Sequence, residues 1–202
     1  MKCSTCYNLQ RPALDLHSVL NCGLTKQFSL NTERLLLRMP RKSDCRDLFL
    51  YAKDPFCSRY CLWRAHRSLK DSCFFINAML KENRTKAALN FAVEEKSTGR
   101  MIGTIGFVSF SMEHSLAEVG YSFAPSIWGR GYATEALNKI VDYAFNTMEL
   151  HRLEAQCDSR NTASARVLEK CGFKREGLMQ KRLFLKDEYA DILFYAMVNK
   201  NA

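Results

Sequence analysis

The sequence predicts a mixed α/β fold in which helices pack against one sheet. Short apolar runs of strand type alternate with longer runs whose apolar residues recur at helical spacing. The element order expected from these runs is β-α-α-β-β-β-α-β-α-β-β. A length of 202 residues suits one domain with a short appendage, and 47% hydrophobic with 25% charged residues is an ordinary globular composition.

Residues 1–31 are expected to form an N-terminal extension, and residues 32–202 the folded domain. The extension lacks a clear hydrophobic period, and Pro12, residues 21–23 (NCG) and Asn31 interrupt it. Terminal segments of this kind either pack on the domain or are loose.

The domain begins with a predicted strand and helix. Residues 33–39 are an apolar run of strand type that Pro40 ends. Ser43 and Asp44 are N-cap residue types, and the apolar face that follows them predicts a helix as far as residues 54–55 (DP).

The next segments are a stretch of open assignment, a predicted helix and a predicted hairpin. Residues 56–70 mix aromatic and basic side chains, which suits a substrate-gripping loop or an ordinary helix surface equally. Residues 69–82 show one apolar helical face. Residues 89–95 and 101–110 form a hairpin because the segment between them contains Gly99.

The second half of the domain alternates strands and helices before a final hairpin. Strands are expected at 118–124 and 152–158, helices at 135–150 and 161–170, and the hairpin at 178–185 and 191–198. Pro125 ends the first of these strands, since proline cannot donate to a ladder. The hairpin turn is expected at residues 186–188.

The stretch WGRGYATE (128–135) connects the strand at 118–124 to the following helix. Gly129 and Gly131 permit φ > 0 and leave no side chain to block a ligand. Backbone N–H groups that enter the first turn of a helix lack intrahelical partners, and the helix dipole favours an anion there. A phosphate is the most natural ligand, although a plain strand-to-helix turn also uses glycine. Neither the Rossmann nor the P-loop pattern is met.

The formal net charge of +9 favours anionic partners and argues against a polycationic substrate such as spermidine. No basic block or nucleic-acid-binding motif appears, so direct nucleic-acid binding is not expected. No apolar run approaches the roughly 18 residues of a membrane helix, and the N-terminus lacks the apolar segment of a signal peptide. These features predict a cytoplasmic protein.

The nine cysteines of a cytoplasmic protein are expected to be reduced thiols. Four of them lie in apolar contexts and are assigned to the core: Cys45, Cys73, Cys157 and Cys171. Cys3, Cys6, His17 and Cys22 offer a zinc-ligand set, which would suit a zinc-bearing nucleic-acid binder. Only one Cys-x-x-Cys is present and the second pair is spaced unlike common zinc fingers, so no metal is expected.

Several ordered motifs together resemble the GNAT acyltransferases, and within them the branch of ribosomal-protein alanine N-acetyltransferases. The longest is EVGYSFAPSIWGRGYATEA at 118–136. Others at matching places are TERLLLR at 32–38, RLEA at 152–155, NTAS at 161–164 and EKCGF at 169–173. The resemblance runs from about residue 32 to the C-terminus. It implies a central, mostly antiparallel sheet flanked by helices.

The resemblance also implies acetyl-CoA as the donor substrate. The family holds the CoA pyrophosphate on the backbone N–H groups of the glycine turn, which here are Gly129, Arg130, Gly131, Tyr132, Ala133 and Thr134. Trp128 precedes the turn, as it commonly does in this branch, and Asn161 matches the asparagine that contacts the CoA arm. Tyr121 and Phe123 are assigned to the donor site, on a strand that would splay from the strand at 153–158 to admit pantetheine.

Catalysis in this family is direct attack of an amine on the thioester. Glu118 is the candidate base, because histone-type members carry a glutamate on this strand; a surface ion pair is its alternative role. Another branch places the base where this chain has Gln156, whose amide cannot take a proton. Many members have a tyrosine acid at the position of Leu168, so Ser164 on the same helix is the candidate hydrogen-bond donor to the departing sulfur. A backbone N–H of residues 119–123 would hold the thioester oxygen.

The branch implies a protein N-terminal amine as acceptor, as on a ribosomal protein. The alternatives are a small amine or antibiotic, and a non-catalytic acetyl-CoA-binding module. Residues 56–70 and 186–189 are expected to border the acceptor entrance. The protein is expected to be a monomer or a homodimer.

Overall fold

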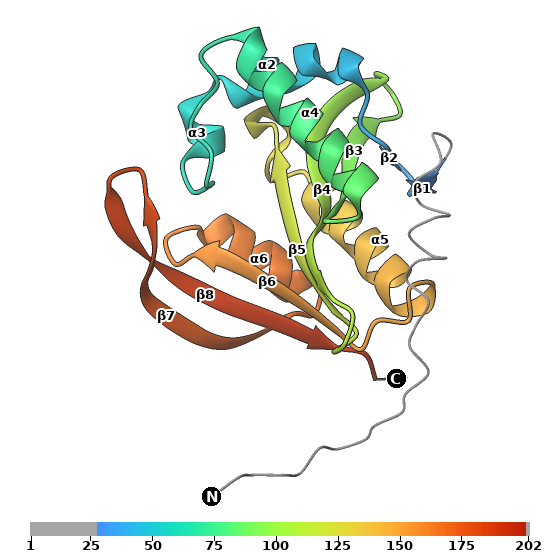
Figure 1. The fold of residues 1–202 in the computed structure, drawn as a ribbon, viewed down its shortest axis with the longest axis vertical. Helices are drawn as coiled ribbons and strands as arrows, with labels where there is room; N and C mark the ends of the chain where they lie inside the picture. The colour runs from blue at the N-terminus through green and yellow to red at the C-terminus, as the bar shows by residue number, and fades with distance from the viewer. Residues whose placement is uncertain (1–27, 201–202) are drawn as a thin grey trace, which may run out of the picture.

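The computed structural model describes residues 28–200, which form one eight-stranded sheet flanked by helices (Figure 1). The spatial order of the strands is β1-β2-β3-β4-β5-β6-β8-β7. Neighbouring strands are antiparallel except for β5 and β6, which are parallel. The strands are β1 (Ser29–Asn31), β2 (Leu35–Arg38), β3 (Leu89–Glu95), β4 (Arg100–Ser111), β5 (Leu116–Phe123), β6 (Arg152–Asp158), β7 (Lys174–Leu185) and β8 (Glu188–Val198). The predicted mixed α/β class is confirmed.

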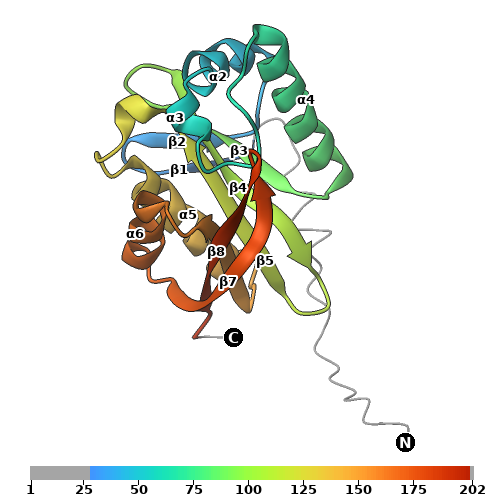
Figure 2. The same cartoon turned by 90° about the vertical axis from the view of Figure 1, so that its left-hand side faces the viewer.

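Helices lie on both sides of the sheet. They are α2 (Cys45–Ala52), α3 (Pro55–Ser58), α4 (Leu69–Thr85), α5 (Tyr132–Asn146) and α6 (Thr162–Lys170), with short 3-10 turns at η1 (Lys42–Asp44) and η2 (Pro125–Ile127). Helices α2 and α4 pack on each other and contact β4 and β3, whereas α5 contacts β2 and β4 from the opposite side (Figure 2).

The core lies where the apolar face of a helix packs on the apolar face of the sheet. Leu137 and Ile140 of α5 have no exposed surface, because they recur on the face that packs on the sheet. Phe107 of β4 is also fully buried, with its ring centre 6.4 Å from that of Tyr143 on α5. This packing fixes α5, and with it the glycine turn that precedes the helix.

Strands β5 and β6 separate part of the way along their length. They pair from Leu116 opposite Arg152 to Val119 opposite Ala155, and no pairing continues beyond that point. The rest of β5 still pairs with β4, and the rest of β6 with β8, so each strand follows a different half of the sheet. The predicted splay between these two strands is confirmed.

Several element boundaries differ from the predictions. Ser29–Asn31 pairs with β2, so the sheet includes three residues that sequence analysis placed in the extension. Pro55–Ser58 is a helical turn begun by Asp54, whose side chain accepts from the Phe56 N–H, so of the two alternatives left open for residues 56–70 the first three residues adopt the helical one. Helix α5 starts at Tyr132 rather than at residue 135, and it ends at Asn146 rather than at residue 150. The predicted end was too late because Met148 and Leu150, in the connection after the helix, are buried and continue the apolar pattern.

The zinc-ligand hypothesis at Cys3, Cys6, His17 and Cys22 lies outside the described residues. Within residues 28–200, no group of three or more His, Cys, Asp or Glu side chains is arranged to hold a metal ion. No helix in the same range is long and apolar enough to span a bilayer.

Candidate active site

The glycine turn joins β5 to α5 in a left-handed conformation. Gly129 and Gly131 have φ values of 74° and 82°, where a β-carbon would be strained. Gly131 is the N-cap of α5 and no side chain caps the helix. The first bond of the helix runs from the Glu135 N–H to the Gly131 carbonyl at 3.0 Å. The three preceding N–H groups therefore have no helical partner and can bind an anion such as a phosphate.

Arg34, in the segment before β2, contacts the glycine turn and the first turn of α5. Its Nε donates to the Glu135 carboxylate at 2.6 Å and its Nη1 to the Arg130 carbonyl at 3.0 Å. Its guanidinium also lies 4.2 Å from the centre of the Tyr132 ring. The Thr32 hydroxyl donates to the same carboxylate at 2.6 Å. Burial alone would raise the pKa of Glu135, but the hydrogen bonds from Thr32 and Arg34 lower it.

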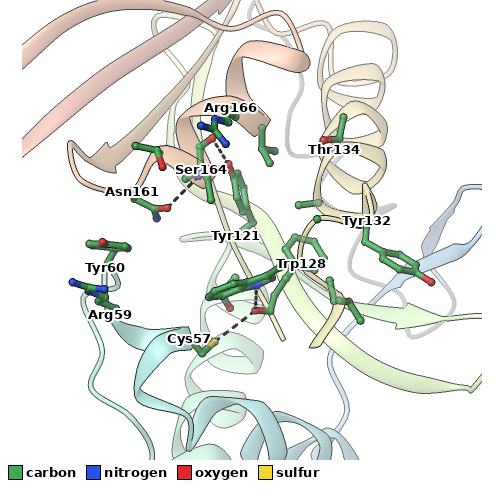
Figure 3. A pocket seen from close by; sticks show the side chains of 18 of the residues that line it. Cys57, Arg59, Tyr60, Tyr121, Trp128, Tyr132, Thr134, Asn161, Ser164 and Arg166 are labelled. Carbon is green, nitrogen blue, oxygen red and sulfur yellow. Dashed lines mark hydrogen bonds between the residues drawn. The ribbon is translucent and has the colours of Figure 1, made fainter. Parts of the chain in front are cut away.

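A first cavity of about 490 Å³ opens beside the turn (Figure 3). Its lining includes most of the predicted donor-site residues, namely Tyr121, Phe123, Trp128, Gly129, Gly131, Tyr132, Ala133, Thr134 and Asn161, together with Ser164. Arg130 does not line this cavity. Figure 3 shows the Tyr132 side chain turned away from the other labelled residues, and its hydroxyl donates to Glu95 at 2.5 Å. Tyr132 therefore offers the cavity its backbone rather than its phenol.

The start of α6 forms the opposite wall of the first cavity. Asn161 is the N-cap of this helix, and its Oδ1 accepts from the Ser164 N–H at 3.1 Å. The Tyr121 hydroxyl reaches across from β5 to within 2.9 Å of the Ser164 hydroxyl and 3.2 Å of its carbonyl (Figure 3). Burial raises the pKa of Tyr121, so the phenol stays protonated at neutral pH and keeps a hydrogen to donate.

Several lining residues were not identified from the sequence. Arg166 and Lys170 stand four residues apart on α6 and both line the first cavity, where their charges suit phosphate groups. Cys57 of α3 also lines it, and burial raises the pKa of this thiol to about 12, so it is protonated and not nucleophilic. The spacing of Arg166 and Lys170 was visible in the sequence, but which face of α6 meets the cavity was not.

A second cavity of about 310 Å³ adjoins the first, since Tyr60 lines both. Glu118 and Gln156 lie in the second cavity and not in the first. Burial raises the pKa of Glu118, the Glu154 carboxylate opposite it on β6 raises it further, and a hydrogen bond from Gln156 opposes both effects. Glu118 therefore takes up a proton more readily than an ordinary glutamate.

The turn between β7 and β8 is joined to three other segments around these cavities. Residues 186–188 supply the contacts, from Lys186 to the Ser58 carbonyl, from Asp187 to Arg64, and from Glu188 to Arg160. The two segments predicted to border the acceptor entrance, residues 56–70 and 186–189, are therefore in contact with each other.

Parallel strands that splay beside an anion-binding helix N-terminus form a cleft that suits a ligand carrying a phosphate. A family model described as the acetyltransferase (GNAT) domain matches residues 34–174. An uncharacterised N-acetyltransferase, YoaA of Bacillus subtilis, is 30% identical over 169 residues, which cover 84% of this chain and 96% of the relative. The chain belongs to the GNAT acetyltransferase family.

Two solved structures share this fold with the chain. The microcin C7 self-immunity acetyltransferase MccE, in complex with acetyl-CoA and AMP, superimposes with a TM-score of 0.75 at 26% identity, covering 83% of this chain and 93% of that one. The ribosomal-protein-S5-alanine acetyltransferase from Vibrio fischeri gives 0.71 at 25% identity, covering 87% and 98%. The chain is thus an acetyl-CoA-dependent N-acetyltransferase, and the non-catalytic alternative is set aside.

Proposed function

We propose that this enzyme acetylates the N-terminal amine of a protein. The observation that carries the proposal is the single unpaired carboxylate that residues 28–200 place in the second cavity. Glu118 is the one carboxylate among its described lining residues that no cation pairs, because Asp158 is bound by Arg160 at 2.7 Å. A polyamine needs a countercharge for each of its ammonium groups, whereas a protein N-terminus brings one. The likeness to the Vibrio fischeri ribosomal-protein acetyltransferase supports the same acceptor class.

Donor binding is assigned to the first cavity. The free N–H groups at the start of α5 would hold the pyrophosphate, because a phosphate complements both the donors and the helix dipole. Arg166 and Lys170 would neutralise further phosphate charge from α6. The arm of the donor would then follow Tyr121 and Phe123 along the part of β5 that β6 leaves unpaired.

Transfer is proposed to occur where the two cavities adjoin. Glu118 accepts a proton from the acceptor ammonium, and the free amine attacks the thioester carbonyl. The carbon–sulfur bond breaks as the amide forms, the second amine proton ends on the CoA sulfur, and the Ser164 hydroxyl hydrogen-bonds that departing sulfur. The Tyr121 hydroxyl, 2.9 Å from that of Ser164, keeps the serine oriented. A raised pKa suits Glu118 to this role, since it brings the carboxylate closer to the basicity that a general base needs.

Mass spectrometry of the acetylated products tests the acceptor class without thiol dyes, which nine cysteines would disturb. Three acceptors are compared: a peptide with a free N-terminus and one internal lysine, the same peptide with a blocked N-terminus, and spermidine. The expected result is acetylation of the first peptide at its α-amine alone. Acetylation confined to spermidine or to the lysine side chain would refute the proposal.

A further inference from the structure

Arg182 is a cation of the second cavity that has no assigned role. It lines this cavity together with Glu118 and apolar side chains such as Leu183 and Ile192. Among the described residues, no carboxylate pairs with Arg182, whereas the nearby cations Arg64 and Arg160 are each bound to carboxylates. The Arg182 side chain is exposed to solvent, and a guanidinium without a carboxylate partner can bind an anion that enters the cavity.

An irregularity of β7 sets the position of Arg182. Met179 pairs with Ile192 and Leu183 pairs with Ala190, so the three residues between Met179 and Leu183 face a single residue of β8. Lys181, in the middle of this bulge, has a φ of 48°, and its N–H donates to the Asp191 carboxylate at 2.8 Å. A bulge changes the direction of the side chains beside it, and a non-glycine residue at positive φ is held there by its surroundings.

We propose that Arg182 binds a carboxylate carried by the acceptor, so that the preferred acceptor is an amine with an acidic group close by. This inference rests on the proposed function. Glu118 and Arg182 line the same cavity and carry opposite charges. Glu118 and Arg182 would therefore bind opposite charges of one acceptor, the ammonium at one end and a carboxylate at the other. Such a carboxylate belongs to an acidic residue near a peptide N-terminus or to a free amino acid.

The test uses two acceptor pairs that differ in charge alone. One pair is the peptide amides Ala-Asp-Asp-Ala and Ala-Asn-Asn-Ala, and the other is leucine and leucine amide. Initial rates at saturating acetyl-CoA give kcat/KM for each, in the wild type, Arg182→Gln and Lys181→Gln. Lys181 has the same charge and lies next to Arg182, but it does not line the cavity. Calorimetric titration with acetyl-CoA confirms that each variant retains its donor site.

We expect the wild type to prefer the acidic peptide by about tenfold in kcat/KM, with the difference residing in KM. Arg182→Gln abolishes the preference, Lys181→Gln retains it, and added salt reduces it. Equal rates within both pairs, or a preference that survives in Arg182→Gln, would overturn the inference and leave the proposed function standing. Transfer to leucine and not to either peptide would overturn the protein acceptor, while the role of Arg182 would remain. No transfer to any acceptor would overturn both.

Discussion

Replacing Arg34 tests whether the glycine turn is held in shape by side chains that never reach the first cavity. The Arg34 guanidinium joins the Glu135 carboxylate to the Arg130 carbonyl, and so ties the first turn of α5 to the segment before it. Arg34→Ala removes both bonds. Glu135 keeps its hydrogen bonds from the Thr32 hydroxyl and from the Arg34 backbone N–H, so α5 should still fold.

The size of the effect follows from the exposure of the pair. Hydrogen bonds to charged groups contribute about 1.5–3 kcal/mol, and the Arg34 side chain is 41% exposed, which favours the lower end. A loss of about 1.5 kcal/mol in the ordering of the turn reduces the fraction of the protein that can bind acetyl-CoA, and the apparent affinity falls by up to about tenfold. Arg34→Lys keeps the charge but cannot bridge the two acceptors, so it should weaken binding nearly as much.

Calorimetric titration separates this explanation from a general loss of positive charge. Acetyl-CoA is titrated into the wild type, Arg34→Ala, Arg34→Lys and Arg130→Ala, the last of which removes an equal charge from the turn but keeps its carbonyl. S-acetylpantetheine, which lacks the pyrophosphate, should bind the wild type and both Arg34 variants equally. Full affinity in Arg34→Lys, or an equal loss for the truncated donor, would refute the reasoning.

Three further predictions concern proton transfer and stability. Glu118→Gln should lower kcat by about 100-fold with acetyl-CoA affinity unchanged. Folding raises the pKa of Glu118, so ionisation of this carboxyl reduces the stability of the wild type as the pH rises. In scanning calorimetry the variant should therefore melt at a higher temperature than the wild type at pH 7 but not at pH 4. Tyr121→Phe should lower kcat with little change in the KM for acetyl-CoA, whereas an unchanged kcat would remove the phenol from the mechanism. Arg38→Met leaves the buried carboxylate of Asp44 and the half-buried one of Glu94 without their cation, and urea titration should show a loss of about 3–5 kcal/mol.

Local chemistry allowed much of the fold to be predicted. Glycines 129 and 131, the apolar stripe of α5 and the proline after β5 each act within a few residues, so their consequences can be read from sequence. Strand β1 was not predicted because a run of three residues is too short to show the alternation of a strand. It is a strand only because it pairs with β2 in the folded protein.

The candidate site was less predictable because it depends on register. Glu118 and Tyr121 are three residues apart on β5, so strand alternation places them on opposite faces, but only the tertiary fold places them in adjoining cavities. The bulge that positions Arg182 has no signature in the sequence around it, since Lys181 is an unusual residue at positive φ. The pairing of Tyr121 with Ser164 joins residues 43 positions apart.

Leu168 occupies the position where many members of the family carry a tyrosine that protonates the departing sulfur. Its side chain is 1% exposed and belongs to the core, so this position of α6 faces the sheet rather than the first cavity. The phenol that reaches the first turn of α6 instead comes from Tyr121 on the opposite wall. Tyr121 lies on the part of β5 that β6 leaves unpaired, so it meets Ser164 beyond the point where the two strands separate. The proposed role of Ser164 therefore depends on the splay between β5 and β6, and not on the residue at position 168.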